Sequence, residues 1–172
     1  FWKNLQKKFL MKKISESEII KLVKDNNNFR EEVIIPIGED ASAIFPKQDV
    51  NMVLTTDTMV LNTHFKDDIT PYELGYISAA SNISDISAMG AYPAFVLINL
   101  TLLNNSDEYI KELINGYNSL FSQFPVTVIG GDTTYGPTSI TMTLIGYSNS
   151  NNFMATNDSK ENDIIFISGS IG

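Results

Sequence analysis

The segment at 70–90, TPYELGYISAASNISDISAMG, restricts the fold of this chain more than any other part of the sequence. Thr70 has the side chain of an N-cap residue, and Pro71 suits the first helical position, where no backbone N–H is needed. Glu73 completes a capping box with Thr70, and Gly90 suits the left-handed position that ends many helices. The sequence therefore predicts one helix between Thr70 and Gly90.

This predicted helix is rich in small residues, and its side chains fall on two stripes. Residues three and four apart lie on the same face of a helix. One stripe carries Leu74, Ile77 and Ser81. The other carries Ser78, Asn82 and Asp85. We expect the second stripe to present oxygen atoms to a neighbouring site.

Apolar or β-branched runs on both sides of the helix predict strands. EEVIIPIGED at 31–40 and NMVLTTD at 51–57 each end in acidic or hydroxyl residues, as strands that lead into loops do. The run at 126–136 is predicted to lead into a glycine-rich turn. Further strands are predicted at 93–103, 138–148 and 163–172. Capping residues predict two more helices, which follow Ser15 and Ser106.

The composition excludes several classes of protein. A chain of 172 residues with 43% hydrophobic and 19% charged residues can form one globular core. No apolar run approaches the roughly 20 residues of a membrane span. A net charge of −8 argues against binding to nucleic acid or to an anionic membrane. The lack of cysteine excludes disulfides and thiolate zinc sites and is compatible with a reducing compartment, so we expect the cytoplasm.

Four aspartates share a setting among glycine, serine, threonine and asparagine: Asp40, Asp57, Asp85 and Asp132. Each is predicted at a strand end or on the polar stripe of the helix. Carboxylate oxygens suit Mg²⁺, which also keeps waters and binds substrate phosphates, whereas zinc would need histidine or cysteine. The alternative is that each aspartate is a cap or turn residue, which is the commoner use.

The sequence contains no P-loop and no G-x-G-x-x-G after a strand. Gly130, Gly131 and Gly136 could bring backbone amides to a phosphate, or could simply form a turn. His64, the only histidine, could assist a serine, but no G-x-S-x-G is present. Phosphoryl transfer requires neither, because its catalysis consists mainly of positioning and charge neutralisation.

Four segments occur together in one order: IGEDASAI, TTDTMVLNTHF, LGYISAASNISDISAMGAYP and VIGGDTTYGPTSITMTLIGY. In these segments and their spacing, from about Ile14 onward, the chain resembles the thiamine-monophosphate kinase family. That family belongs to a superfamily with aminoimidazole-ribonucleotide synthetase, selenophosphate synthetase and a hydrogenase-maturation factor. The resemblance implies an α+β fold in which a mixed or antiparallel sheet is backed by helices. It also implies Mg²⁺-dependent transfer of the γ-phosphoryl group of ATP to thiamine monophosphate, in a homodimer.

The resemblance implies roles for individual residues. Magnesium ligands are expected at Asp40, Thr55, Thr56, Asp57, Asp85 and Asp132. Contacts to ATP are expected at Gly131 and Asp132, and a contact to the substrate at His64. The acceptor is itself a phosphate that is largely dianionic at pH 7, so the reaction needs cations rather than a general base.

Three positions depart from the family pattern. Glu39 replaces the first aspartate of a GDD segment, and Tyr135 stands where an arginine is common. Thr156 stands where an ATP-contacting arginine is expected, which weakens the expectation of that contact.

The family also has a second domain. We expect residues 11–148 to form the N-terminal ATP- and magnesium-binding and dimerisation domain, and 149–172 to be a linker and the start of a truncated C-terminal domain. Residues 1–10, which are basic and amphipathic, are expected to be an extension that precedes the natural start at Met11.

Two alternatives remain open at this stage. One is a sister ATP-dependent enzyme of the same superfamily, although selenophosphate synthetase would need a reactive cysteine or selenocysteine and the chain has no cysteine. The other is a non-catalytic module for nucleotide binding or dimerisation. Magnesium-dependent nucleotide binding without turnover would indicate the second.

Overall fold

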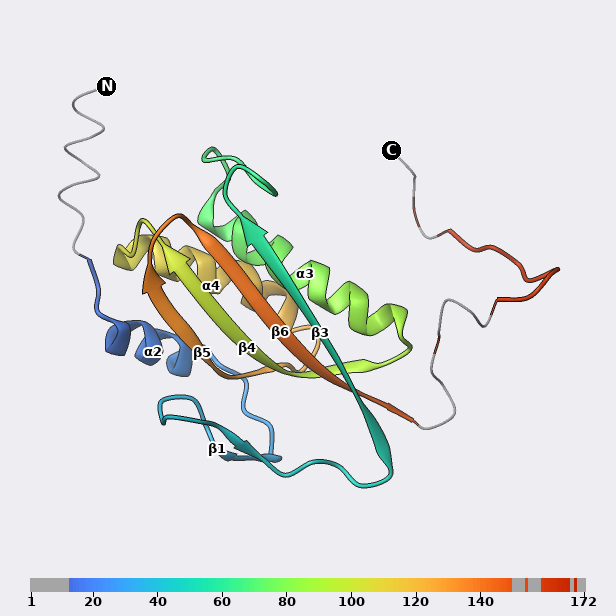
Figure 1. Cartoon of the computed structure of the whole chain (residues 1–172). Helices are drawn as coiled ribbons and strands as arrows, with labels where there is room; N and C mark the ends of the chain where they lie inside the picture. Colours follow the sequence, from blue (N-terminus) through green and yellow to red (C-terminus); the bar gives the residue numbers. More distant parts are fainter. Residues whose placement is uncertain (1–12, 150–153, 155–158, 168, 170–172) are drawn as a thin grey trace.

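Helices cover one face of a four-stranded sheet in the computed structural model, which describes residues 13–149, 154, 159–167 and 169 (Figure 1). The elements are α2 (Glu16–Asp25), β1 (Val33–Ile35), β2 (Ala43–Ile44), β3 (Val50–Val60), α3 (Pro71–Ala88), β4 (Tyr92–Leu102), α4 (Asp107–Phe121), β5 (Thr127–Tyr135) and β6 (Ser139–Asn149). The strand order is β3-β6-β4-β5. Since β4 and β5 are parallel and the other two pairs are antiparallel, the sheet is mixed, which confirms the expected α+β fold.

The helix predictions are confirmed because their signals are local. Ser15 and Thr70 each form a complete capping box, with Glu18 and Glu73 respectively, and Ser106 caps α4. In the polar stripe of α3, however, Ser78 and Asn82 are buried and bond to backbone carbonyls of the same helix, so only Asp85 remains exposed to solvent.

Two predicted strand ends are wrong. Asp57 was expected to end a strand, but β3 continues to Val60 and pairs with β6 along its whole length. Asp132 was also expected at a strand end, but it lies inside β5, which stays paired with β4 as far as Tyr135. In both cases the hydrogen-bond partners of a neighbouring strand extend the strand past polar residues.

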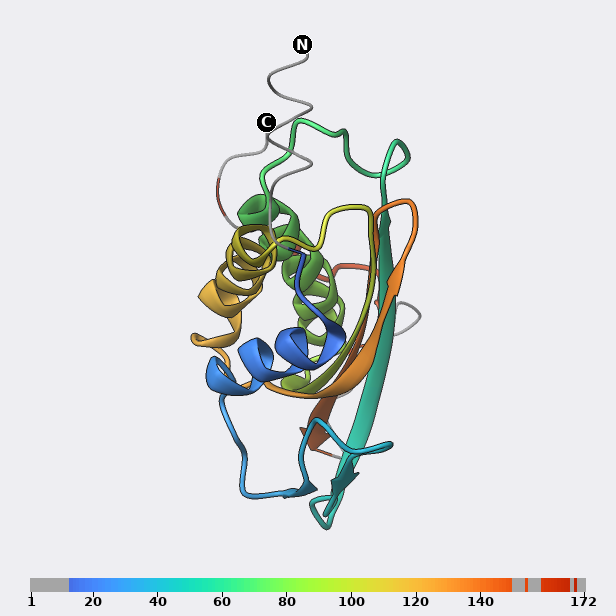
Figure 2. The ribbon, with the colours of Figure 1, turned by 90° about the vertical axis from the view of Figure 1, so that its left-hand side faces the viewer.

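The main core lies between the sheet and the helices α3 and α4, which pack closely on each other (Figure 2). A Cβ atom on Gly75 would lie 2.2 Å from the carbonyl oxygen of Leu113, and one on Gly116 would lie 2.0 Å from that of Tyr72. The two helices therefore meet through main-chain atoms. Residues such as Leu74, Ile110 and Phe121 fill the space beneath them and are almost completely buried.

We call the sheet face that is turned away from α3 and α4 the open face. The β1 and β2 pair covers one end of it over a second apolar cluster that contains Phe95, Ile129, Ile145 and Tyr147. No helix of the described residues is long and apolar enough to cross a bilayer.

Ion pairs connect the residues on either side of the β1 and β2 pair to the open face. Glu32 is 8% exposed, and its Oε1 lies 2.9 Å from Nη2 of Arg30 and 3.5 Å from Nζ of Lys47. The guanidinium of Arg30 lies 5.5 Å from the centre of the Phe95 ring, and the ammonium of Lys47 lies 5.8 Å from that of Tyr147. The charges thus pack on the aromatic rings of the second cluster.

These ion pairs predict a pH dependence of stability. The hydrogen bond from Arg30 lowers the pKa of Glu32 below its ordinary value of 4.5. A carboxyl group whose pKa is lower in the folded state stabilises that state above the unfolded pKa, and this contribution is lost as the pH falls. We expect Glu32→Gln to reduce the free energy of unfolding by about 2 kcal/mol near neutral pH, with a difference that shrinks as the pH falls below 4.5. Urea denaturation at several pH values measures this difference.

The matched control is Glu31→Gln, because Glu31 is the exposed neighbour of Glu32 and makes no ion pair among the residues that the structure describes. Its stability should follow that of the unmodified protein at every pH. An equal loss in both variants, or a Glu32→Gln loss that does not depend on pH, would show that the ion pairs contribute nothing specific.

A strand was predicted at 163–172, and this prediction is wrong for the part of that range that the structure describes. Residues 163–167 form no strand, and among the described residues no other strand pairs with them. Ile164, Ile165 and Phe166 are 77%, 89% and 87% exposed. The predicted extension at 1–10 and the departure at Thr156 lie outside the described residues.

Candidate functional site

A cavity of about 850 Å³ lies at the β5 edge of the sheet, between that edge, the loop before β2 and helices α2 and α4. Its buried wall is apolar and includes Ile19, Ile110, Ile114, Tyr117 and Val128. Its exposed wall is polar and includes Glu39, Asp40, Asn99, Gly131 and Asp132. Successive residues of β4 point to opposite faces, and both Ile98 and Asn99 line the cavity, so it reaches both faces of the sheet.

Gly131 brings the backbone of β5 unusually close to β4. Its φ is +147°, and a Cβ atom would lie 1.8 Å from the carbonyl oxygen of Ile98. Only glycine fits such a position without moving main-chain atoms. Asp132 follows directly, and its Oδ1 accepts a hydrogen bond of 2.9 Å from the amide of Thr133.

Side chains from the preceding segment cover the edge of β5. The carboxamide of Asn27 forms two hydrogen bonds with the backbone of Val128, of 2.7 and 2.9 Å. The hydroxyl of Ser42 donates to the carbonyl of Ile129. These bonds fasten the loop that carries Asp40 to the strand that carries Asp132, so the two carboxylates line the same cavity.

A second group of predicted ligands lies near α3. Thr55 and Asp57 pair with Leu144 and Met142 of the core, so both side chains lie on the helix side of the sheet. The hydroxyl of Thr55 donates to Oδ2 of Asp85 at 2.7 Å. Thr55, Asp57 and Asp85 thus form a hydroxyl and carboxylate group between β3 and α3.

Thr56 points to the open face, because neighbouring residues of a strand alternate. Its Oγ1 lies 3.0 Å from Oγ1 of Thr143, which lines the cavity. A hydrogen bond therefore connects Thr56 to the cavity.

The six predicted metal ligands do not meet at one point. Strands β3 and β5 are opposite edges of the sheet, so Thr55, Asp57 and Asp85 lie apart from Asp40 and Asp132. In the described part of the chain, no three acidic or histidine side chains are grouped closely enough to hold a metal ion by themselves. Each group nevertheless offers two carboxylates and small neighbours, a donor set that suits a cation that also binds phosphate and water.

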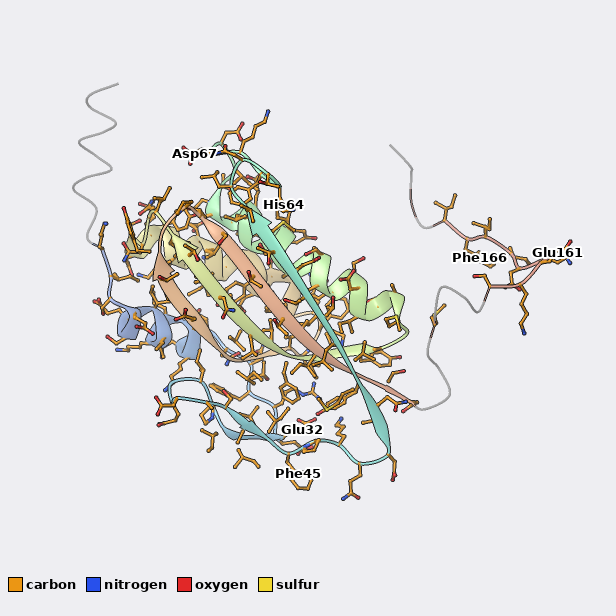
Figure 3. All side chains as sticks on the ribbon, viewed as in Figure 1. Glu32, Phe45, His64, Asp67, Glu161 and Phe166 are labelled. Atoms are coloured by element: carbon orange, nitrogen blue, oxygen red, sulfur yellow. The ribbon has the colours of Figure 1, made fainter. Side chains whose placement is uncertain are left out.

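His64 lies at the end of β3, at the opposite end of the molecule from Glu32 and Phe45 (Figure 3). Its Nδ1 accepts a hydrogen bond of 3.1 Å from the amide of Val60. The neighbouring Phe65 is buried, and its carbonyl accepts a 2.7 Å hydrogen bond from the amide of Asn62. The loop is thereby fixed, and within the described part of the chain Nε2 of the exposed imidazole has no hydrogen-bond partner.

Several polar residues that line the cavity were not predicted from the sequence, among them Ser42, Asn99 and Thr143. Asn99 could have been found, because it interrupts the apolar run VLINL in the middle of a strand. Ser42 and Thr143 have no comparable signal, since their positions depend on strand order.

Residues 38–148 match the family of AIR synthase related proteins, in its N-terminal domain. Over 140 residues, the chain is 38% identical to the thiamine-monophosphate kinase of Haemophilus influenzae, a match that covers 81% of this chain and 43% of that protein. The crystal structure of thiamine-monophosphate kinase from Stenotrophomonas maltophilia has a TM-score of 0.73 and 30% identity, and covers 83% of this chain and 45% of that one.

AaThiL, which was solved in complex with AMPPCP and TMP, has a TM-score of 0.56 and 22% identity, and covers 78% of this chain and 42% of that one. At this identity the likeness concerns the fold alone. The chain spans somewhat less than half the length of each of these three proteins. From the match over 38–148, we conclude that the chain belongs to the family of AIR synthase related proteins and carries its N-terminal domain.

Proposed function

We propose that the protein to which this chain belongs is a thiamine-monophosphate kinase, which transfers the γ-phosphoryl group of ATP to thiamine monophosphate and gives ADP and thiamine diphosphate. The similarity to named kinases over most of the chain supports this proposal. The cavity beside Gly131, with Asp40 and Asp132 on its exposed wall, is the structural observation that carries it.

The cavity suits a nucleotide in size and chemistry. Its volume of about 850 Å³ lies within the usual range for small-molecule sites, and its buried wall is apolar as a purine requires. At the exposed wall, Gly131 has no side chain to obstruct a phosphate. We assign Asp40 and Asp132 as ligands of phosphate-bound Mg²⁺ there, with Gly131 and Asp132 in contact with ATP.

The group between β3 and α3 is proposed to hold further magnesium. Thr55 and Asp57 would ligate with Asp85, whose Oδ2 already accepts from Thr55 at 2.7 Å. The hydroxyl of Thr56 lies on the open face, so it would have to ligate magnesium on that side of the sheet. When bound there, Mg²⁺ would neutralise negative charge on the phosphoryl group that is transferred. Because two phosphates must approach each other, the protein's task is to position them and to supply oxygen ligands to cations.

His64 is proposed to bind the acceptor phosphate. Since Nδ1 accepts from the amide of Val60, a neutral imidazole carries its proton on Nε2, which can donate a hydrogen bond to a phosphate oxygen. This assigns binding to His64 and requires no general base.

We also infer a homodimer in the cytoplasm, built on a domain at 11–148, with 1–10 as an extension and 149–172 as the start of a further domain. The open face supports pairing with a second copy, because it exposes Met52 and Leu54 at 43% and 60% and none of the helices α2, α3 and α4 that the structure describes covers it.

The test is an assay of the protein expressed from the complete reading frame that contains this chain. Purified protein is incubated with thiamine monophosphate and Mg·ATP, and thiamine diphosphate is quantified, with EDTA as the metal-free control. Product that requires magnesium supports the kinase. A folded protein that binds Mg·ATP and yields no product would indicate the non-catalytic module or a sister enzyme.

A further inference from the structure

Lys24, in the last turn of α2, extends over the loop that carries Asp40. A Cβ atom on Gly38 would lie 2.4 Å from Nζ of Lys24 and 2.8 Å from its Cε. The ammonium group therefore rests against the Cα atom of Gly38. Gly38, Glu39 and Asp40 all line the cavity, so the charge of Lys24 lies at its rim.

The position of Gly38 makes this contact possible. Its φ is +112°, a conformation that side-chain-bearing residues rarely adopt, so glycine is favoured there by the backbone alone. The missing side chain leaves the space that the lysine head occupies. Ile20 and Val23 of the same helix line the cavity, so α2 forms a wall with Lys24 at the edge of that wall.

The charges around the cavity give this ammonium particular weight. The described lining residues include four carboxylates, Glu16, Glu39, Asp40 and Asp132, and no lysine or arginine. Within the described part of the chain, Lys24 forms no ion pair and no side-chain hydrogen bond, and its side chain is exposed. A polyanion entering the cavity would therefore meet this cation at the rim without having to displace a carboxylate from it.

We propose that Lys24 binds the polyphosphate of the nucleotide in this cavity, as a cationic contact additional to the magnesium ligands. The proposal rests on the proposed function, because it assumes that the cavity holds ATP. An ammonium group is a compact point charge with three donors on a flexible stem, which suits a phosphate chain that changes position during transfer.

A structural role is the alternative. A lysine in the last turn of a helix also interacts favourably with the negative end of the helix dipole. That role would stabilise α2 and its wall of the cavity, and so would affect every ligand of the cavity equally. A contact to phosphate would affect only ligands that carry phosphates.

The experiment compares Lys24→Ala with Lys21→Ala in the protein from the complete reading frame. Lys21 lies on the same helix and is also exposed, but the side-chain atoms nearest to Gly38 belong to Lys24 and Ile20. Affinities for Mg·ATP and for adenosine are measured by calorimetry at low and at moderate salt. Lys24→Arg tests whether another cation can replace the ammonium.

We expect Lys24→Ala to weaken Mg·ATP binding about tenfold at low salt and to leave adenosine binding unchanged. The loss should shrink as salt screens the exposed charge. Lys24→Arg should recover most of the affinity, and Lys21→Ala should change it less than about twofold, as is usual for an exposed charge without a partner.

Equal losses for Mg·ATP and adenosine would make Lys24 structural and overturn the proposal, and so would an unchanged affinity for Mg·ATP. If the unmodified protein binds neither ligand, the nucleotide site of the proposed function is wrong and the role of Lys24 fails with it. That outcome differs from a failure of Lys24 alone, in which the unmodified protein binds both ligands.

Discussion

Replacing Asp57 by asparagine is expected to lower kcat/KM for thiamine diphosphate formation by at least about 100-fold, since even residues that only support metal ligands cost 10- to 100-fold. Asp57 lies on the helix side of β3, two residues from Thr55, whose hydroxyl donates to Asp85 at 2.7 Å. The amide keeps the shape of the side chain and removes the negative charge that would hold Mg²⁺. Initial rates over a range of magnesium concentrations measure the loss.

The control for this variant is Asp49→Asn. Asp49 lies directly before the same strand and has a φ of +60°, which asparagine tolerates well. Both variants lose one negative charge, but only Asp57 belongs to the proposed site. We expect Asp49→Asn to keep its activity and both proteins to keep their thermal midpoint. Full activity in Asp57→Asn would remove this residue from the set of metal ligands.

Gly131→Ala is expected to cost about 3 kcal/mol or more of folding free energy and to abolish nucleotide binding. Two effects add up: alanine is strained in this backbone conformation, and its Cβ atom clashes with β4. The added Cβ would lie 1.8, 2.6 and 2.9 Å from the carbonyl oxygen, carbonyl carbon and amide nitrogen of Ile98. These are main-chain atoms of β4, an inner strand, so they cannot move without breaking the sheet. Urea denaturation gives the stability, and calorimetry with Mg·ATP gives the affinity.

The adjacent Gly130 provides the comparison. Its added Cβ would meet only side-chain atoms, Cδ2 of Leu97 at 3.1 Å and Oγ of Ser42 at 3.5 Å. Gly130→Ala should therefore cost much less stability than Gly131→Ala. Similar losses in the two variants would show that the close approach of β5 to β4 does not determine the effect.

The helices could be predicted from the sequence because their signals are local. The hydroxyls of Ser15, Thr70 and Ser106 accept from backbone amides three residues later, so each cap is contained within one turn. The interiors of β3 and β5 could not be predicted in the same way. Asp57 and Asp132 look like strand ends, and only pairing with residues distant in sequence keeps them in strands.

The types of the site residues could be predicted, but not their grouping. Oxygen-bearing side chains at Asp40, Asp85 and Asp132 are visible in the sequence, whereas their distribution over two edges follows from the order β3-β6-β4-β5. The ion pairs of Glu32 were missed for a related reason. Glu32 comes directly before β1 and Lys47 comes after β2, so their contact depends on the antiparallel pairing of these two strands.

The contact of Gly75 and Gly116 has a consequence for how this fold can change over evolution. The atoms that a larger residue would meet are the carbonyl oxygens of Leu113 and Tyr72, so trimming a neighbouring side chain cannot make room. A substitution at one of the two glycines cannot be compensated by a second substitution at the other. The distance between α3 and α4 should therefore stay constant among homologous chains. The position of Asp85, which α3 carries, should stay constant with it. Homologous chains that keep this helix pair should have glycine at both positions, however far the rest of the two helices has diverged.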